Sequence, residues 1–581
     1  MRRCPTCNRL ETDDALAFCR VDGTALVRNS SSISTEAGTA RLGSTSLPSE
    51  IETSILPHTT AAANARSTAP TTVLPSETGP SPTGKLSRPA LRRNFLIGIV
   101  LLIVIAGAAG AIGSWYLARR NTAAIQSIAV MPFVNATGNA DVEYLSDGLT
   151  ESLINSLSRL PNLSVKARST VFRYKGRDLS PQQAGSELSV QSVLNGRVVQ
   201  RGDQLTVSVD LVNAPTGDQI WGQQYNGKMA DAISLQTQIA GDLSRRLQAN
   251  FSTADREKLN RGSTTNADAY LLYLKGRYQT AKYTKDGLAK GREYFDQAIA
   301  LDPRYALAYD GFADNYIAAA DWFMASKEAL PRAGAAAKKA LELDDTLAEA
   351  HASLATVHWW FDWDWPAAEA EFKRAIQLNP NDARAHQFYG WFLITLARYD
   401  DGIAENKRAQ SLDPLSVETN ALLGQGLCFA RRYDEAIQQL QSTLEMDQNY
   451  WLAHSLLGRS YEQQGKLNQA IAEFQRALDL EKDVPENYAM LAHGYAIAGR
   501  KTEAAKLLGQ LQDMSTKRHV PPYNIAIVYA GLGDKEQAFS WLERGYADRS
   551  FYLTWLKYDP QLDSLRSDPR FADLMRRVGL S

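Results

Sequence analysis

Cysteine is scarce in this sequence. The 581 residues contain four cysteines, and three of them, Cys4, Cys7 and Cys19, lie close to the N-terminus, so a disulfide framework is excluded. Net charge is nearly absent as well, because 63 Lys and Arg residues are balanced by 64 Asp and Glu residues. This balance gives no indication of nucleic-acid binding or of an acidic substrate. A chain of this length is expected to contain more than one domain.

Catalytic signatures are also absent. The sequence has no G-x-x-x-x-G-K-[ST] phosphate loop and no G-x-S-x-G, H-E-x-x-H or protein-kinase motif. Among its few histidines, His351, His386 and His454 recur at one position of a repeating unit, which indicates helix packing. Asp147 and Glu151 share one helical face, and we interpret them as a solvated acidic surface. The sequence therefore predicts a protein that is not an enzyme and has no catalytic residues.

One long hydrophobic run interrupts an otherwise soluble composition. Residues 95–117, FLIGIVLLIVIAGAAGAIGSWYL, are uncharged and long enough to span about 30 Å of hydrocarbon as a helix. The run lies too far from the N-terminus to be a cleavable signal peptide. Basic residues are more numerous before it than after it. We therefore expect a single-pass protein of the bacterial cytoplasmic (inner) membrane, with a cytoplasmic N-terminus and all later domains extracytoplasmic.

The first residues contain a candidate metal site. Cys4 and Cys7 form a C-x-x-C pair, and Cys19 and Asp22 follow in a C-x-x-D-G sequence. Thiolates at this spacing suit tetrahedral Zn²⁺. Residues 1–28 resemble the short N-terminal zinc ribbons of many bacterial membrane proteins, except that Asp22 stands where another cysteine is usual. A structural zinc ion is thus expected, and two alternatives remain: Asp22 is not a ligand, or the segment is a disordered, reduced tail.

Two segments of contrasting character follow. Residues 29–90 are rich in Ser, Thr, Ala and Pro and lack aromatic residues, which predicts a disordered linker. Residues 124–250 alternate short strand patterns with amphipathic helices, and Gly202-Asp203 marks a hairpin turn. The sequences SIAVMPF, EYLSDGLTESLINSLSRLP and LNGRVVQRGDQLTVSVDLVNAPTGDQIW resemble the TolB amino-terminal-like (FlgO-like) domain. That resemblance implies an α/β fold outside the cytoplasmic membrane, often followed by tetratricopeptide repeats.

The C-terminal half of the chain is repetitive. Leu378, Leu412, Met446 and Leu480 follow one another at intervals of 34 residues, the period of tetratricopeptide repeats. Residues 265–550 resemble that family in about eight units, and residues 551–581 resemble its capping helix. Small residues at fixed positions let paired helices approach and the next pair stack. The expected fold class is multidomain: a small zinc ribbon, a disordered linker, one transmembrane helix, an α/β TolB-N-like domain and an all-α TPR superhelix.

A tetratricopeptide array has a concave groove that fits an extended peptide or a helix of a partner. The positions that face this groove are Trp359, Trp360, Arg384, Gln387, Trp391, Glu418, Gln425, Arg459, Glu462 and His493. A second candidate surface is an exposed aromatic patch of Trp322, Phe323 and Trp363. Packing of these aromatic residues in the repeats is the alternative to binding.

Three hypotheses about function follow from the sequence. The first is a membrane-anchored, non-enzymatic scaffold or sensor that binds a protein partner through its groove. The second is an accessory subunit of a transmembrane signalling system that acts through a separate output protein, since similar chains carry a kinase, cyclase or DNA-binding module. The third is binding of glycan or cell wall through the aromatic patch. None of the three involves nucleic acid.

Overall fold

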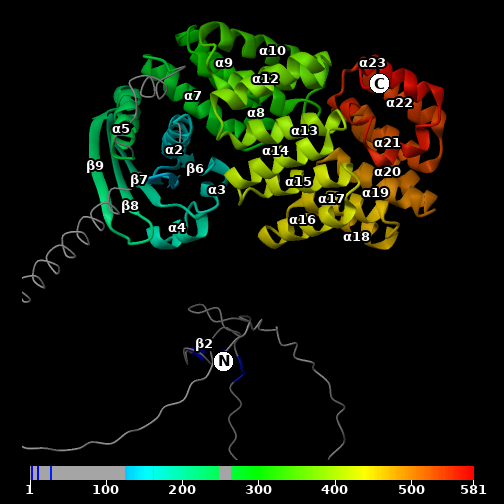
Figure 1. The fold of residues 1–581 in the computed structure, drawn as a ribbon, viewed down its shortest axis with the longest axis horizontal. Helices are drawn as coiled ribbons and strands as arrows, with labels where there is room; N and C mark the ends of the chain where they lie inside the picture. The colour runs from blue at the N-terminus through cyan, green and yellow to red at the C-terminus, as the bar shows by residue number, and fades with distance from the viewer. Residues whose placement is uncertain (1, 4–9, 12–26, 29–124, 161–162, 248–262) are drawn as a thin grey trace, which may run out of the picture. The chain divides into compact units, whose positions relative to one another are not determined.

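The computed structural model describes residues 2–3, 10–11, 27–28, 125–160, 163–247 and 263–581 (Figure 1). The chain divides into two units, Met1–Gly98 and Ile99–Ser581. In the first unit, β1 (Arg2–Arg3) pairs antiparallel with β2 (Leu10–Glu11) and with β3 (Val27–Arg28). The predicted zinc ligands Cys4, Cys7, Cys19 and Asp22, and the predicted linker 29–90, lie outside the described residues.

The second unit begins with a mixed sheet in the order β6-β4-β7-β8-β9. Its strands are β4 (Ser127–Val130), β5 (Val134–Asn135), β6 (Ser164–Val165), β7 (Ser192–Arg201), β8 (Gln204–Asn213) and β9 (Gln219–Lys228). The short strand β4 runs parallel to β6 and β7, whereas β7, β8 and β9 form an antiparallel meander. The β7–β8 turn lies at Gly202, whose φ of 60° suits glycine.

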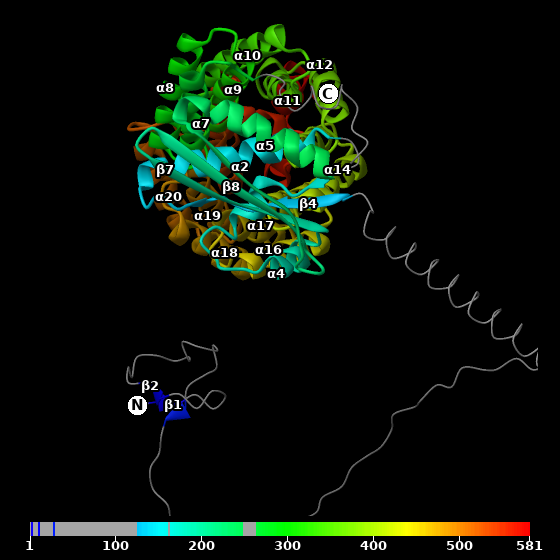
Figure 2. The ribbon, with the colours of Figure 1, turned by 90° about the vertical axis from the view of Figure 1, so that its left-hand side faces the viewer.

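Helices cover the apolar face of this sheet. They are η1 (Ala140–Val142), α2 (Glu143–Ser158), α3 (Arg168–Phe172), α4 (Pro181–Leu188), η2 (Met229–Asp231) and α5 (Ala232–Leu247). Leu205, Val207 and Val209 of β8 alternate with polar residues and are buried in one core with Leu153 of α2 and Ile239 of α5. Figure 2 shows α2 and α5 side by side beside β7 and β8.

Eight helix pairs follow within residues 263–581, each an inner helix and an outer helix (Figure 1). The inner helices are α7 (Ala267–Thr280), α9 (Ala306–Ala319), α11 (Ala348–Val357), α13 (Ala383–Thr395), α15 (Val417–Phe429), α17 (Trp451–Gln463), α19 (Pro485–Ile497) and α21 (Pro522–Leu532). The outer helices are α8 (Lys285–Leu301), α10 (Ser326–Leu343), α12 (Trp365–Leu378), α14 (Tyr399–Leu412), α16 (Tyr433–Met446), α18 (Leu467–Leu480), α20 (Lys501–Ser515) and α22 (Lys535–Ala547).

Small residues allow the paired helices to approach. A Cβ atom on Gly390 of α13 would lie 2.7 Å from the carbonyl oxygen of Gly402 on α14. A Cβ atom on Gly458 of α17 would lie 2.6 Å from the ring of Phe474 on α18. The third pair differs from the others, because five residues after α11 form a π-helical turn, η3 (His358–Asp362). This turn accommodates the extra residue of the unit.

The chain ends in three short helices, η4 (Phe551–Trp555), η5 (Pro560–Leu565) and α23 (Pro569–Val578). Asp321, in the α9–α10 loop, is fully buried and holds the start of this segment. Its Oδ2 accepts hydrogen bonds from Ser550 Oγ at 2.7 Å and from the Phe551 backbone N–H at 2.8 Å. A loop of the second helix pair is thereby tied to the chain beyond the eighth.

The predicted fold class included a transmembrane helix, and the structure corrects this. Among residues 125–160, 163–247 and 263–581, no helix is both long and apolar enough to cross a membrane. Even the 18-residue α10 carries charged side chains such as Lys338 and Lys339. This part of the chain is a mostly helical superhelix with a mixed-sheet domain. The prediction of a single-pass inner-membrane protein is corrected with it, and residues 95–117 lie outside the described residues.

Candidate functional site

The inner face of the array holds the predicted groove residues, but most of them are covered. Seven are buried: Trp359, Trp360, Gln387, Gln425, Arg459, Glu462 and His493. Trp391 is half-buried, and Arg384 and Glu418 are exposed. The structure therefore leaves two of the ten positions open to a partner.

The C-terminal segment covers the inner face from the third pair onward. The ring of Phe551 stacks on Trp360 with centroids 4.5 Å apart. Trp555 lies edge-on to Trp391 at 6.4 Å and tilted against Phe429 at 5.5 Å. Aromatic contacts of this kind add to the free energy gained from burial. Residues 551–565 thus occupy the place where a peptide partner was expected.

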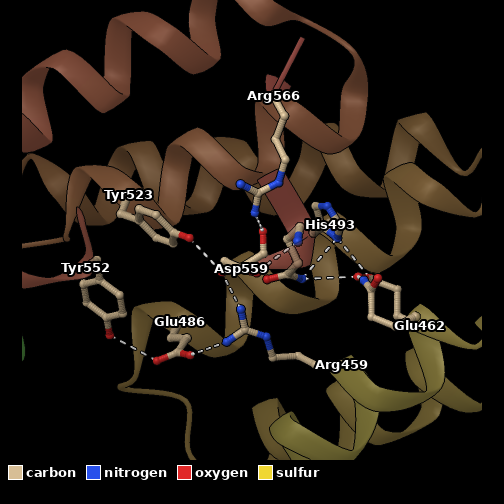
Figure 3. Close-up of polar contacts among 10 residues, drawn as sticks. Arg459, Glu462, Glu486, His493, Tyr523, Tyr552, Asp559 and Arg566 are labelled. Carbon is tan, nitrogen blue, oxygen red and sulfur yellow. Dashed lines mark hydrogen bonds and ion pairs between the residues drawn. The ribbon is translucent and has the colours of Figure 1, made fainter. Parts of the chain in front are cut away.

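A buried ion pair anchors this segment (Figure 3). Arg459 of α17, 1% exposed, donates from Nη2 to Asp559 Oδ2 at 2.6 Å, and Tyr523 OH donates to the same oxygen at 2.7 Å. Glu486 lies 3.9 Å from Arg459 Nη1 and accepts from Tyr552 OH at 3.1 Å. Burial raises the pKa of Glu486 more than Arg459 lowers it. Two carboxylates from distant parts of the chain therefore share one guanidinium.

A second buried group lies beside this ion pair. His493 Nδ1 is 2.9 Å from Glu462 Oε2, and Gln561 Nε2 lies 3.2 Å from the same histidine nitrogen (Figure 3). Three of the predicted groove residues, Arg459, Glu462 and His493, thus bind the protein's own C-terminal segment.

The α/β domain covers the inner face at its other end. Ser169 and Thr170 of α3 donate hydrogen bonds to Asp413, in the loop between α14 and α15. Arg173 donates to the Leu415 carbonyl at 2.7 Å. Arg159, at the end of α2, pairs with Glu349 of α11 at 3.0 Å. These contacts dock the sheet domain onto inner helices of the array.

A cavity of about 240 Å³ remains between α2, α3 and the inner helices α7, α9, α11 and α13. Its charged lining is Glu151, Arg168, Arg277, Asp310, Asp314, Glu349, Asp382, Arg384 and Asp413. Glu151, which we interpreted as solvated, is buried, and its pKa is lowered because Arg277 and Arg168 outweigh the effect of burial. Arg277 Nη2 lies 2.6 Å from Glu151 Oε1, and Nη1 lies 3.2 Å from Asp314 Oδ2.

The structure does not gather the predicted aromatic patch into one exposed surface. Trp363 is buried against Tyr546, with the Arg549 guanidinium 4.1 Å from its ring centroid. Trp322 lies edge-on to Trp451 at 6.2 Å. Phe323 alone of the three is exposed, at 36%. A glycan platform is therefore not supported.

The three repeat histidines contact carboxylates of the outer helices rather than packing against apolar side chains. His454 Nδ1 lies 2.6 Å from Glu473 Oε2, and its Nε2 lies 3.1 Å from the Gln448 carbonyl oxygen. His351 and His386 repeat this arrangement with Glu371 and Glu405. Two acceptors at one ring favour hydrogen on both nitrogens. Burial lowers the pKa values of His351 and His454, but these bonds outweigh it and the pKa values are raised. His386 and His454 are 68 residues apart, and so are Glu405 and Glu473, which is twice the repeat period of 34. This shared spacing could have indicated the pairing.

Among the described residues, no group of three or more His, Cys, Asp or Glu side chains is placed to hold a metal ion. Cys428 is buried, and burial raises the pKa of its thiol to about 11. A thiol with so high a pKa is a poor nucleophile at neutral pH.

Two family models match parts of the chain. Residues 124–241 match the second domain of HilA/YgeH-like transcriptional regulators. Residues 364–417 and 422–486 match the tetratricopeptide repeat, so the predicted repeats are confirmed. The resemblance of residues 124–250 to the TolB amino-terminal-like domain and the zinc ribbon at residues 1–28 are not confirmed.

Two curated relatives and one solved structure are similar over part of the chain. Putative adenylate cyclase 3 of Rhizobium meliloti (strain 1021) is 26% identical over 40% of this chain and 40% of its own length. Transcriptional regulator HilA of Salmonella typhimurium is 22% identical over 48% of this chain and 49% of its own length. The chain thus spans less than half the length of either relative. YrrB, a TPR protein with an unusual peptide-binding site, is 24% identical with a TM-score of 0.25, over 33% of this chain and 94% of that structure.

Proposed function

We propose that residues 125–581 form a non-enzymatic scaffold that binds a protein or peptide partner on the part of the inner face that remains accessible. Tetratricopeptide arrays bury their own apolar faces by stacking and use the concave side for binding. The observation that carries the proposal is an open section of that side, formed by Tyr283, Arg384 and Glu418 and bordered by the half-buried Tyr450. Tyr283 is 56% exposed, the Arg384 side chain is 50% exposed, and Glu418 is exposed.

The open section has the composition of a peptide-binding surface. Tyr283, in the α7–α8 loop, lies within electrostatic range of Arg384 on α13 and Glu418 on α15. The surrounding protein atoms raise the pKa of Glu418 above its ordinary value, although its side chain remains accessible to a partner. Tyrosine and arginine are enriched among the residues that contribute most to protein–protein binding. A peptide with both a basic and an acidic side chain would complement Arg384 and Glu418.

Site-specific photo-crosslinking tests this proposal. A photoreactive amino acid replaces Tyr283 in the full chain, and a matched control replaces Leu301, which is 48% exposed at the end of the outer helix α8. We expect a partner adduct of defined mass from position 283 and none from position 301. Charge reversal by Arg384→Glu should abolish the adduct. Equal adducts from both positions, or none from position 283, would contradict the proposal.

We further propose, as a second candidate function, a role as an accessory regulator that acts through a separate output protein. The supporting observation is that relatives named as a cyclase and as a transcriptional regulator are similar to this chain over less than half of their lengths. Partial similarity to two proteins of such different names favours a role in receiving a signal over a role in producing the output. A chimaera in which the 238 residues of this chain that are similar to the cyclase replace the corresponding region of the cyclase should retain regulated cyclic-AMP synthesis. Unregulated synthesis would argue against this role.

A further inference from the structure

Asp310, on α9, is a buried carboxylate that contacts no cation within the described residues. It is 5% exposed and lines the cavity between the α/β domain and the array. Its Oδ1 accepts a hydrogen bond from Ser353 Oγ at 3.0 Å, and its Oδ2 has no partner in the described part of the chain. By contrast, Glu151, Asp314 and Glu349 each contact an arginine.

Six carboxylates but only three arginines line the cavity. Burial, together with the neighbouring Glu349 and Asp314 carboxylates, raises the pKa of Asp310 to about 7. Glu349 Oε2 is also buried and has no hydrogen-bond donor among the described residues. Buried acceptors without donors are costly, and buried charges are usually paired. A ligand that brought a positive charge and several N–H groups would satisfy both carboxylates.

Part of the lining is apolar. Ile154 of α2, Leu307 and Ile317 of α9, and Phe388 of α13 border the same cavity. The cavity has a volume of about 240 Å³. Since one water-sized atom group occupies roughly 30 Å³, the cavity holds a molecule of about eight heavy atoms. The space thus suits a short alkyl chain beside an acidic end.

We propose that this cavity binds an aliphatic ammonium group, whose N–H bonds donate to Asp310 and Glu349 and whose alkyl chain lies against Ile154 and Ile317. A free amine and the lysine side chain of a partner share this chemistry. The cavity is lined by α2 and α3 of the α/β domain and by four inner helices, so an occupant holds the two parts together. Arg384 borders both this cavity and the open section, but Asp310 and Glu349, which would hold the ammonium group, are not part of the open section.

Calorimetric titration of the full chain with n-butylammonium, in an amine-free buffer, tests the proposal. We expect saturable binding of n-butylammonium, and none of butyrate or 1-butanol at the same concentrations. Asp310→Asn should weaken binding by about tenfold or more, because the charge-assisted hydrogen bond is lost. The matched control Asp296→Asn changes an exposed aspartate on the outer helix α8 and should leave binding unchanged. Equal binding by wild type and Asp310→Asn would overturn the proposal, as would equal binding of butanol.

A second variant tests the same cavity in case Asp310→Asn fails to fold. Ala352→Leu fills the cavity from α11 without changing its charge, and it should also abolish binding of n-butylammonium. Binding that survived this change would place the amine elsewhere and overturn the assignment. Nα-acetyl-lysine N-methylamide then distinguishes the two sources: tighter binding than n-butylammonium supports a partner's lysine, and weaker binding supports a free amine.

Discussion

Arg459 depends on a residue 100 positions further along the chain for its charge partner. Its guanidinium is 1% exposed and would be costly to bury without Asp559. Burial alone would lower the pKa of Arg459, but Asp559 and Glu486 raise it, so the arginine stays charged. The C-terminal segment is therefore held to the array by electrostatics as well as by its aromatic contacts.

We predict that Arg459→Met lowers the free energy of unfolding by about 3–5 kcal/mol, because Asp559 is left buried and unpaired. Urea denaturation measures the change. Arg500→Met is the matched control, since Arg500 forms an exposed pair with Glu503 on α20 and should have little effect. Adding Asp559→Leu to Arg459→Met should restore part of the loss. Strict additivity of the two changes would show that the pair is not coupled.

At this scale the sequence predicted the positions of the groove residues better than their environment. Repeat phase assigned Arg459, Glu462 and His493 to the inner face, and the structure places them on α17 and α19. The sequence contained no signal that Asp559 and Gln561 would cover these residues, since the contacts join residues about 70 to 100 positions apart. Local periodicity reports which face a side chain occupies but not what lies opposite it.

Within a helix pair, glycine shows how closely the two helices pack. Gly390 on α13 is opposed by the Gly402 backbone, whereas a Cβ atom added to Gly509 on α20 would meet no neighbouring atom within 4 Å. Alanine is the better helix former by about 1 kcal/mol, so the environment decides the sign of each substitution.

We predict that Gly509→Ala raises the free energy of unfolding by about 0.5–1 kcal/mol. Gly390→Ala should lower it despite the same gain in helix propensity, because α13 and α14 must separate. Thermal unfolding of the two variants provides the comparison. An equal gain from both would mean that the α13–α14 contact is not as close as the structure indicates.

Each histidine–glutamate pair joins an inner helix to its outer partner. Burial would lower the pKa of His454, but the bonds to Glu473 and to the Gln448 carbonyl outweigh it, and the pKa is raised. His351 is raised in the same way with Glu371 and the Asp345 carbonyl. A raised histidine pKa stabilises the fold below about pH 6.5, and this contribution is lost as pH rises through the folded-state value.

We predict that nuclear magnetic resonance titration finds His454 protonated above pH 6.5. Glu473→Gln should move the His454 pKa downward and lower the melting temperature at pH 6 more than at pH 9. Glu445→Gln, on an exposed face of α16, is the control and should leave the titration of His454 unchanged. An unaltered His454 titration in Glu473→Gln would remove the carboxylate as its cause.

Within residues 125–581, the α/β domain and the array share one hydrophobic core. Tyr270 and Leu274 of α7 belong to the same buried core as Leu149 and Leu153 of α2. A Cβ atom on Gly148 would lie 2.8 Å from Leu274, so the two helices meet at a glycine. Residues 125–581 are therefore expected to unfold cooperatively rather than as independent repeats.

We predict that Gly148→Leu separates α2 from α7 and divides one calorimetric unfolding transition into two. Gly138→Leu would be a poor control because Gly138 has a φ of 77°, which strains other residues. Gly241→Leu on α5 is better, since the nearest side-chain atom would lie 3.8 Å from a Cβ atom added at that position. That control should keep a single transition. Two transitions in the unaltered protein would show that the domains are energetically separate.

At the scale of the whole chain, the sequence indicated an array of helix pairs because the 34-residue period repeats in Leu378, Leu412, Met446 and Leu480. It also indicated the β7–β8 hairpin from Gly202 and Asp203. The docking of Arg159 on Glu349, and of Arg173 on the loop before α15, could not be predicted in this way. Such contacts depend on the curvature of the array, which the repeat period alone does not specify.

In a solenoid of stacked helix pairs each repeat contacts only its neighbours, so the array can extend and compress along its length. Here the buried Asp321 restricts such extension, because it joins the loop of the second helix pair to Ser550 and Phe551 by hydrogen bonds. Extension of the array would first require the hydrogen bonds of Asp321 to break. The open section should accordingly keep a nearly constant conformation, because the second helix pair and the C-terminal segment cannot move apart.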